Sequence, residues 1–180
     1  MPKTKKIENK KIAVLEEKER NALSKIEKIV INVGIGKLRG QNQFEEKILK
    51  EIIDEVALLS GQKPITRKAK KSIAGFKIRK GDIVGLQVTL RRKRLWDFLT
   101  KLIHIVLPRV KDFKGIDLKN IDKSGNLNIG LKEQFIFPEI NPEKSKVNFG
   151  VEVTIVLKTK KRDEAIDFYR KIGVPLKRNG

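Results

Sequence analysis

Four stretches of the chain alternate hydrophobic and polar residues, which predicts β-strands with one buried face. They span residues 26–33, 83–91, 126–137 and 150–159, and a shorter strand is expected near 64–70. The alternation is clearest in the last stretch, where Val151, Val153 and Ile155 alternate with Glu152 and Thr154. Because successive side chains of a strand point to opposite faces, the pattern predicts a sheet that is covered on one side only.

Three other stretches repeat hydrophobic residues at three- and four-residue spacing, which predicts amphipathic helices at 44–60, 93–106 and 162–172. Gly61, Pro108 and Gly173 are expected to end them. The alternation of elements predicts an α+β fold, a two-layer sandwich of a mostly antiparallel sheet with helices on one face and an open second face. We expect a basic tail with a short helix over residues 1–24 and a single α+β domain over 25–180.

The charge of the chain predicts a polyanionic partner. Its 180 residues include 42 Lys and Arg against 22 Asp and Glu, a formal net charge of +20 at pH 7. Such an excess favours binding to phosphates through counterion release. No hydrophobic run approaches the roughly 20 residues that span a bilayer, and the basic N-terminus lacks the apolar run of a secretory signal. We therefore expect an intracellular protein whose partner is a polyanion, for which DNA, RNA and an anionic membrane surface all qualify.

The most basic segment lies at residues 63–80, which contain eight Lys and Arg and no acid. A Lys-rich run is often only a solvated surface. However, a protrusion with charge of one sign repels itself unless a polyanion neutralises it. Ala74, Gly75 and Gly81 permit close approach to another backbone. We expect an exposed loop over about 71–81 that contacts a polyanion.

The polar face of the predicted sheet suits folded RNA better than single strands or DNA. Aromatic residues are only 6% of the chain, and Trp96 and Phe98 fall in a helical pattern that predicts a place in the core. Readers of single strands stack bases on aromatic side chains, and readers of B-DNA usually present a helix to the major groove. The basic start of the 93–106 helix is a weak candidate for the latter. The residues expected on the open face or its rim are Asn32, Gln87, Thr89, Arg91, Thr154 and Lys158.

Residues for catalysis are scarce. The chain has no Cys and one His, His104, so a disulfide scaffold, a thiolate metal site and a catalytic triad are excluded. His104 lies beside core positions and is expected to be structural. Glu133 and Glu139 are the carboxylates that acid–base chemistry would use, and the Gly-rich turn at 34–37 lacks the spacing of a nucleotide-binding loop. We expect no catalytic residues, metal or cofactor.

Several segments resemble the bacterial form of large-subunit ribosomal protein five, in order along residues 26–175. The matching segments are 28–36 (KIVINVGIG), 61–64 (GQKP), 66–79 (TRKAKKSIAGFKIR), 88–91 (VTLR), 107–115 (LPRVKDFKG) and 132–140 (KEQFIFPEI). The resemblance implies a structural protein that binds 5S rRNA and helps attach it in the central protuberance. It also implies contacts with large-subunit rRNA, the P-site tRNA, other central-protuberance proteins and small-subunit ribosomal protein thirteen, the last through an intersubunit bridge. A membrane is not among the partners that it implies.

The resemblance implies three sets of site residues. The rRNA-binding set is Asn32, Gln62, Lys63, Thr66, Gln87, Thr89, Arg91 and Arg92. The tRNA-binding loop is Lys68, Lys70, Lys71, Ser72, Gly75, Phe76, Lys77, Arg79 and Lys80. The bridge set is Arg109, Lys111, Asp112, Phe113, Glu143 and Lys144. The chain departs from the family pattern at Arg92 and Lys93, where small or acidic residues are usual, and the added charge indicates stronger phosphate contact there.

Two alternatives differ from this hypothesis in what they bind or do. A free module or chaperone for structured RNA would bind any RNA duplex with equal affinity at matched salt. A nuclease would cleave RNA with a metal ion and lose that activity when Glu133 is replaced. A ribosomal protein would form a saturable complex with 5S rRNA that survives excess tRNA.

Overall fold

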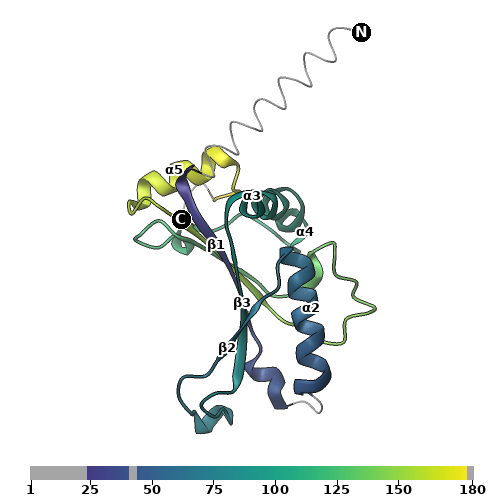
Figure 1. Cartoon of the computed structure of the whole chain (residues 1–180). Coiled ribbons are helices and arrows are strands. Elements are labelled where there is room, and N and C mark those ends of the chain that lie inside the picture. Colours follow the sequence, from purple (N-terminus) through teal and green to yellow (C-terminus); the bar gives the residue numbers. More distant parts are fainter. Residues whose placement is uncertain (1–23, 41–43, 178–180) are drawn as a thin grey trace.

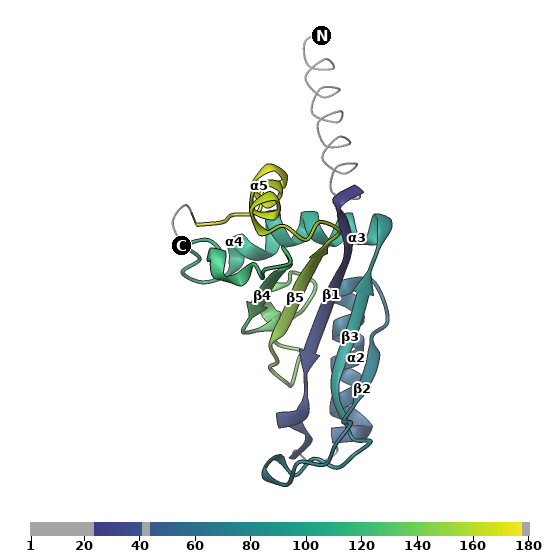
Figure 2. The same cartoon turned by 90° about the vertical axis from the view of Figure 1, so that its left-hand side faces the viewer.

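The strands form one five-stranded antiparallel sheet in the order β2-β3-β1-β5-β4. The computed structural model describes residues 24–40 and 44–177, so the predicted tail and its short helix lie outside the described residues apart from Ser24. The strands are β1 (Ile26–Gly34), β2 (Ile65–Lys68), β3 (Ile83–Leu90), β4 (Leu127–Leu131) and β5 (Val151–Leu157). Figure 2 looks onto one face of this sheet, with α2 (Leu49–Ser60) visible behind it.

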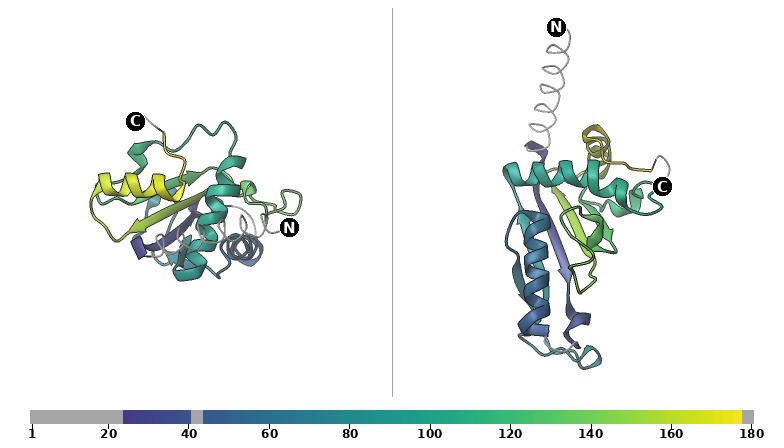
Figure 3. Two further views of the ribbon diagram at one scale, coloured as in Figure 1. Left: turned by 90° about the horizontal axis from the view of Figure 1, so that it is seen from above. Right: turned by 90° about the vertical axis from the view of Figure 1, so that its right-hand side faces the viewer.

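The helices give the sheet its covered face and confirm the predicted α+β sandwich. Phe44–Ile48, a π-helical turn, leads into α2, and α3 (Arg92–Lys101) continues through a second π-helical turn, Leu102–Val106, into α4 (Leu107–Arg109). α2 and α3 lie on the same side of the sheet (Figure 3). The last helix, α5 (Arg162–Ile172), lies beside α3 at the end of the sheet where β1 begins (Figure 1).

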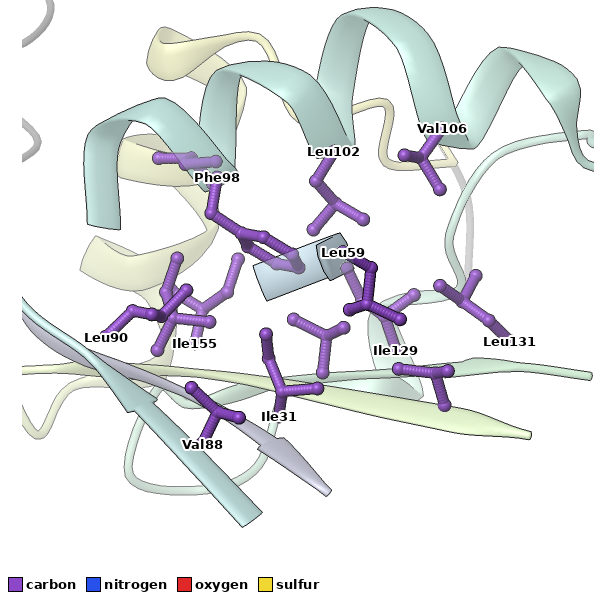
Figure 4. Close-up of a cluster of buried hydrophobic side chains, with 14 of the residues drawn as sticks. Ile31, Leu59, Val88, Leu90, Phe98, Leu102, Val106, Ile129, Leu131 and Ile155 are labelled. Carbon is purple, nitrogen blue, oxygen red and sulfur yellow. The ribbon is translucent and has the colours of Figure 1, made fainter. Parts of the chain in front are cut away.

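The buried face of the sheet follows the predicted alternation. Ile29, Ile31 and Val33 of β1 are buried, and the residues between them are partly exposed. Figure 4 shows Phe98 of α3 and Leu102 of the following π-helical turn pointing toward side chains of the strands. Among these are Ile31, Leu90 and Ile155. Burial of a large aliphatic or aromatic side chain stabilises the fold by roughly 1.5–3 kcal/mol. The packing of these hydrophobic side chains between the helices and the sheet therefore fixes which side of each strand remains open.

A buried tyrosine attaches α5 to the sheet. Tyr169 is fully buried, and its hydroxyl donates a hydrogen bond to the Gly125 carbonyl at 2.9 Å. Burial raises the pKa of Tyr169 well above its usual range, so the hydroxyl keeps its proton and remains a donor. Gly125 has a φ of 80°, and a Cβ there would lie 2.9 Å from Ala165 Cβ, so only glycine lets α5 approach this turn.

The predicted end of the 93–106 helix at Pro108 is wrong, because helical geometry continues to Arg109. Within the π-helical turn, the Leu107 N–H donates to the Leu102 carbonyl five residues back. This wider turn precedes the proline, which has no N–H and crowds the carbonyl four residues before it. Pro108 therefore sits inside the last turn, and the chain becomes extended only at Val110.

The predicted strand at 126–137 is also too long, since β4 ends at Leu131. The cause is Gln134, whose side chain is 0% exposed. Its amide nitrogen donates to the Val147 carbonyl at 2.6 Å, and its amide oxygen accepts from the Phe149 N–H at 3.0 Å. The Gln134 side chain thus satisfies backbone groups of Val147 and Phe149 that would otherwise need a neighbouring strand as partner. The backbone of residues 132–137 therefore leaves the sheet.

We predict that Gln134→Leu lowers the free energy of unfolding by about 1–3 kcal/mol, because it leaves the buried Phe149 N–H without a partner and leaves the Val147 carbonyl with only its hydrogen bond from the Ser145 hydroxyl. Urea unfolding followed by circular dichroism measures this change. Gln87→Leu is the matched control, since Gln87 is only partly buried and its partners can turn to water. That control should cost less than about 1 kcal/mol. Equal losses in the two variants would contradict the role given to Gln134.

Candidate nucleic-acid interface

The open face of the sheet is a polar surface whose residues are aligned by strand register. One row crosses all five strands and consists of Ile65, Gln87, Asn32, Glu152 and Gly130. The next row places Thr89 beside Val30, followed by Thr154 and Asn128. All of these residues are exposed or partly exposed. The structure therefore brings together the predicted residues Asn32, Gln87 and Thr89 on one face.

A chain of hydrogen bonds orients the centre of this face. Arg67 Nε donates to Gln87 Oε1 at 2.8 Å, and its Nη2 donates to the same oxygen. Gln87 Nε2 then donates to Asn32 Oδ1 at 3.0 Å. The Asn32 amide nitrogen makes no hydrogen bond with any described residue, so it can donate to a partner above the sheet. Arg67 was not among the predicted rRNA-binding residues, although it anchors this network.

A second polar group forms a corner where β3 ends and α3 begins. Gln62 follows Gly61, whose φ of 68° ends α2. The Gln62 side chain donates to the Thr89 carbonyl at 3.4 Å and accepts from Arg94 Nη1 at 3.1 Å. These hydrogen bonds join the turn after α2 to the start of α3, so the cations nearby are presented from one fixed surface. We call the exposed residues Lys63, Arg91, Arg92, Lys93 and Arg94 the basic corner.

Two predicted rRNA-binding residues are placed in unusual ways. Thr66 pairs with Leu86, which is buried on the covered side, so Thr66 lies on the helix side of the edge strand β2 and not with Asn32 and Thr89. Arg92 has a φ of 55°, a left-handed conformation that costs a non-glycine residue roughly 1–2 kcal/mol. Position 92 thus carries an arginine side chain although glycine would adopt this backbone conformation with less strain.

The predicted tRNA-binding loop is an extended β-hairpin. Beyond β2 and β3, the Ala69 N–H donates to the Asp82 carbonyl at 2.7 Å and the Gly81 N–H to the Ala69 carbonyl at 2.9 Å. Nearer the tip, Ile73 and Ile78 exchange backbone hydrogen bonds of 2.8 and 3.2 Å. Figure 1 shows this hairpin projecting at the end of the sheet opposite to α5. The segment is therefore ordered by its own backbone.

The side chains of this hairpin confirm the predicted exposure. Phe76 at the tip is 72% exposed. The Ser72 hydroxyl accepts from the Lys80 N–H at 2.9 Å, which ties the two arms together. The other predicted loop residues are all exposed and are Lys68, Lys70, Lys71, Gly75, Lys77, Arg79 and Lys80.

The structure does not bring the six predicted bridge residues together, because they lie along two different hollows, on an exposed loop and against the core. Arg109, Lys111 and Asp112 line a hollow of about 570 Å³ together with residues 130–133, Phe135 and Ile136. Lys144 lines a separate groove beside α2, where the Lys146 N–H donates to Glu51 Oε1 at 2.8 Å and holds the 141–146 loop. Glu143 is exposed on that loop, and Phe113 packs partly buried against the core.

The acidic residues considered for catalysis do not form an active site. Glu139 pairs with Lys101 at 2.6 Å, and Lys101 also donates to the Leu59 carbonyl at 2.7 Å, so this carboxylate is held in an ion pair whose lysine joins three segments of the structure. Glu133 is exposed on its own loop. In residues 24–40 and 44–177, no three His, Asp or Glu side chains gather in a group able to hold a metal ion. None of the helices in these ranges has the length and apolar character needed to cross a membrane.

The two aromatic residues predicted to be in the core and the single histidine lie along α3 and the π-helical turn that follows it. Phe98 is buried, as predicted, and Trp96 packs against the core while remaining partly exposed. His104 lies beside the buried Ile103, as predicted, but its own side chain is exposed on the outer side of the π-helical turn. A structural role for His104 therefore stays a prediction, and the imidazole is open to solvent.

Comparison with known proteins matches both halves of the chain to one family. Residues 22–79 match the family model described as "Ribosomal protein L5", and residues 83–176 match the model of the C-terminus of the same ribosomal protein family. The chain is 47% identical over 158 residues to "Large ribosomal subunit protein uL5" of Pseudothermotoga lettingae, covering 88% of this chain and 84% of that protein. The identically named protein of Lacticaseibacillus casei is 49% identical over 151 residues, covering 84% of this chain and 82% of the relative.

We predict that Arg92→Gly raises the free energy of unfolding by about 0.5–1 kcal/mol, because glycine adopts a φ of 55° without steric cost. Lys93→Gly is the matched control, since residue 93 is helical within α3 and glycine in a helix costs about 1 kcal/mol. Thermal or urea unfolding measures the change in the free energy of unfolding, which should be positive for Arg92→Gly and negative for Lys93→Gly. A loss of stability in Arg92→Gly would show that the Arg92 side chain makes contacts that outweigh its backbone strain.

Proposed function

We propose that this chain, which belongs to the ribosomal protein L5 family, binds 5S rRNA and helps attach it in the central protuberance. As a member of that family it is a structural, non-enzymatic protein of the large ribosomal subunit in the cytoplasm. The observation that carries this proposal is the open sheet face with its fixed donors. Asn32 and Gln87 are held by a hydrogen-bond chain on that face, and the basic corner adjoins it at the end of β3.

The two parts of this surface have different tasks in RNA binding. The cations of the basic corner neutralise phosphates, which supplies affinity that does not depend on sequence. Asn32, Thr89 and Gln62 present hydrogen-bonding groups at defined positions, which suits 2′-hydroxyls and the edges of bases. Because strand pairing fixes their spacing, these groups are ordered before RNA arrives, and binding costs less conformational entropy.

The basic hairpin is a separate contact surface, and we propose that it touches the P-site tRNA. β3 alone separates the hairpin from the basic corner, and its 8 residues extend roughly 26 Å at about 3.3 Å per residue. A backbone-ordered hairpin with exposed cations and an exposed Phe76 can meet a second RNA at that distance. The basic corner and the remaining face then stay free for 5S rRNA and large-subunit rRNA.

The hollow beside α4 suits a protein partner better than RNA. Arg109, Lys111 and Asp112 carry both signs of charge at its rim, and the partly buried Phe135 and Ile136 provide apolar lining. Mixed charge around apolar surface is typical of protein–protein contacts. We propose that this region takes part in the intersubunit bridge with small-subunit ribosomal protein thirteen. The 141–146 loop is available for that protein or for other central-protuberance proteins.

We predict that the double variant Asn32→Ala and Thr89→Ala binds 5S rRNA more weakly by about 1–3 kcal/mol, or roughly 5- to 150-fold, since each hydrogen bond contributes about 0.5–1.5 kcal/mol. A filter-binding titration at fixed salt measures the change. Thr100→Ala with Asn120→Ala, in α3 and in the short turn before β4, is a control of the same composition outside both polar rows. An unchanged titration in the first variant would exclude the open face as the 5S site.

The same titration separates the ribosomal role from a free RNA-binding module. The ribosomal role requires a saturable complex with 5S rRNA that survives excess tRNA. Equal affinity for unrelated RNA duplexes at the same salt would instead support a general RNA-binding module or chaperone, because phosphate contacts alone do not distinguish sequences.

We predict that replacing Lys70, Lys71, Lys77 and Arg79 by Ala leaves 5S rRNA binding within about threefold but weakens P-site tRNA binding to reconstituted ribosomes. Each phosphate-binding cation that is removed should lower the slope of log K against log salt by about 1. The control removes the same charge from exposed positions elsewhere, through Lys123, Lys160, Arg170 and Lys171 to Ala. Loss of 5S binding in the hairpin variant alone would contradict the assignment of the hairpin to tRNA.

A further inference from the structure

The open face contains a hollow to whose lining four glycines contribute. The hollow has a volume of about 470 Å³ and lies over the ends of β1, β3, β4 and β5. Its lining includes Asn32, Arg67, Glu152 and four glycines, which are Gly34, Gly85, Gly130 and Gly150. Gly34 pairs directly with Gly85, and Gly130 lies opposite Glu152. The bare backbone of several strands is therefore exposed side by side.

Packing does not explain two of these glycines. A Cβ added at Gly34 or Gly130 would meet nothing within 4 Å, and neither residue has a positive φ. Glycine weakens a strand because it has no side chain to pack and gains more freedom on unfolding. At Gly85 and Gly150, in contrast, a Cβ would lie 3.2 Å from a backbone carbonyl. Gly34 and Gly130 instead provide open space above the sheet, where a flat group can approach the backbone.

The carboxylate in this hollow is unusual for a surface that binds RNA. The Glu152 side chain is exposed, and its carboxylate makes no hydrogen bond or ion pair with any of the described residues. A carboxylate repels phosphate and accepts hydrogen bonds only. Its complement in RNA is therefore a donor, either a 2′-hydroxyl or a base N–H, and only a base can offer two neighbouring N–H groups to the two oxygens of one carboxylate. The chain has a net charge of +20 and attracts phosphates through its cations, whereas the Glu152 carboxylate repels them. Phosphate binding therefore does not explain a carboxylate at residue 152.

The neighbour of Glu152 supplies the opposite hydrogen-bonding character. Asn32 lies directly across from Glu152 in the strand register, and Cβ atoms of such pairs are about 4.5–5.5 Å apart. Asn32 Oδ1 accepts from Gln87 Nε2 at 3.0 Å, and the Asn32 amide nitrogen, which makes no hydrogen bond with a described residue, can donate to a ligand. The floor of the hollow therefore presents two acceptor oxygens beside a donor N–H.

We propose that this hollow binds one unpaired guanine of 5S rRNA, with Glu152 accepting from guanine N1–H and N2–H and Asn32 donating to O6. Guanine is the base whose Watson–Crick edge has two adjacent donors followed by an acceptor, which matches the two groups in order. Cytosine and uracil each offer one donor and two acceptors, and adenine offers one of each. The guanine must be unpaired, because pairing would occupy the same edge. This inference rests on the proposed binding of 5S rRNA.

The sign of the effect of Glu152→Gln tests the proposal. Glutamine has the same shape but places an N–H₂ donor against the donors of guanine. We expect the affinity for 5S rRNA to fall roughly 10- to 100-fold, as for a missing hydrogen bond to a charged group. Without a base at this carboxylate, removal of one negative charge would instead tighten RNA binding slightly. Asp167→Asn removes the same charge from an exposed position of α5 and should leave the affinity unchanged.

Chemical probing identifies the base. Kethoxal reacts with N1 and N2 of unpaired guanines, so the wild-type complex should protect one guanine that the Glu152→Gln complex leaves reactive, while other protections remain. Gly130→Val is a second variant that fills the hollow. It should unfold at a temperature no lower than the wild type, because valine favours strands, yet lose the same guanine protection.

The outcomes distinguish this inference from the proposed function. If the wild-type chain does not bind 5S rRNA, the proposed function fails and the pocket fails with it. If the wild type binds but Glu152→Gln binds equally or more tightly with an unchanged kethoxal pattern, only the pocket is overturned. Protection from dimethyl sulfate at a cytosine or adenine that depends on Glu152 would overturn the assignment to guanine.

Discussion

The central strand β1 imposes the constraint on which the molecule depends, because each of its side chains must lie either in the core or on the open face. β1 is hydrogen-bonded on both edges, to β3 and to β5. A slip of one residue would bury Asn32 and expose Ile31, with the loss of roughly 1.5–3 kcal/mol for each large side chain moved out of the core. The energy of the core therefore holds the polar rows of the open face in register.

Much of this arrangement could be predicted from the sequence, because alternation reports directly on which face is buried. The positions of Asn32 and Thr89 on one face follow from period two alone. The pairing between strands could not be predicted, since register depends on contacts between residues far apart in the chain. The row that places Glu152 between Asn32 and Gly130 is of this kind, and so is the hydrogen bond from Arg67 to Gln87. The early end of β4 is caused by Gln134, which depends on a loop carbonyl 13 residues away.

Backbone strain is concentrated on the proposed contact surfaces. Within the described ranges, the non-glycine residues with positive φ are Lys77, Arg92 and Asp112. One lies in the basic hairpin, one in the basic corner and one beside the hollow next to α4. Such conformations cost roughly 1–3 kcal/mol and persist only where the surrounding structure enforces them. Each of them sets the direction of a charged side chain at a turn, which a relaxed glycine would not provide.

The distribution of charge explains why a carboxylate belongs on this face. A net charge of +20 attracts any RNA, and counterion release does not distinguish one polyanion from another. Discrimination then requires a group that weakens the wrong complexes as well as groups that favour the right one. At Glu152 a phosphate meets repulsion, whereas a base with a free donor edge meets an acceptor. The basic corner and hairpin supply attraction at the ends of β3, and the carboxylate between them restricts which RNA surface can settle on the sheet.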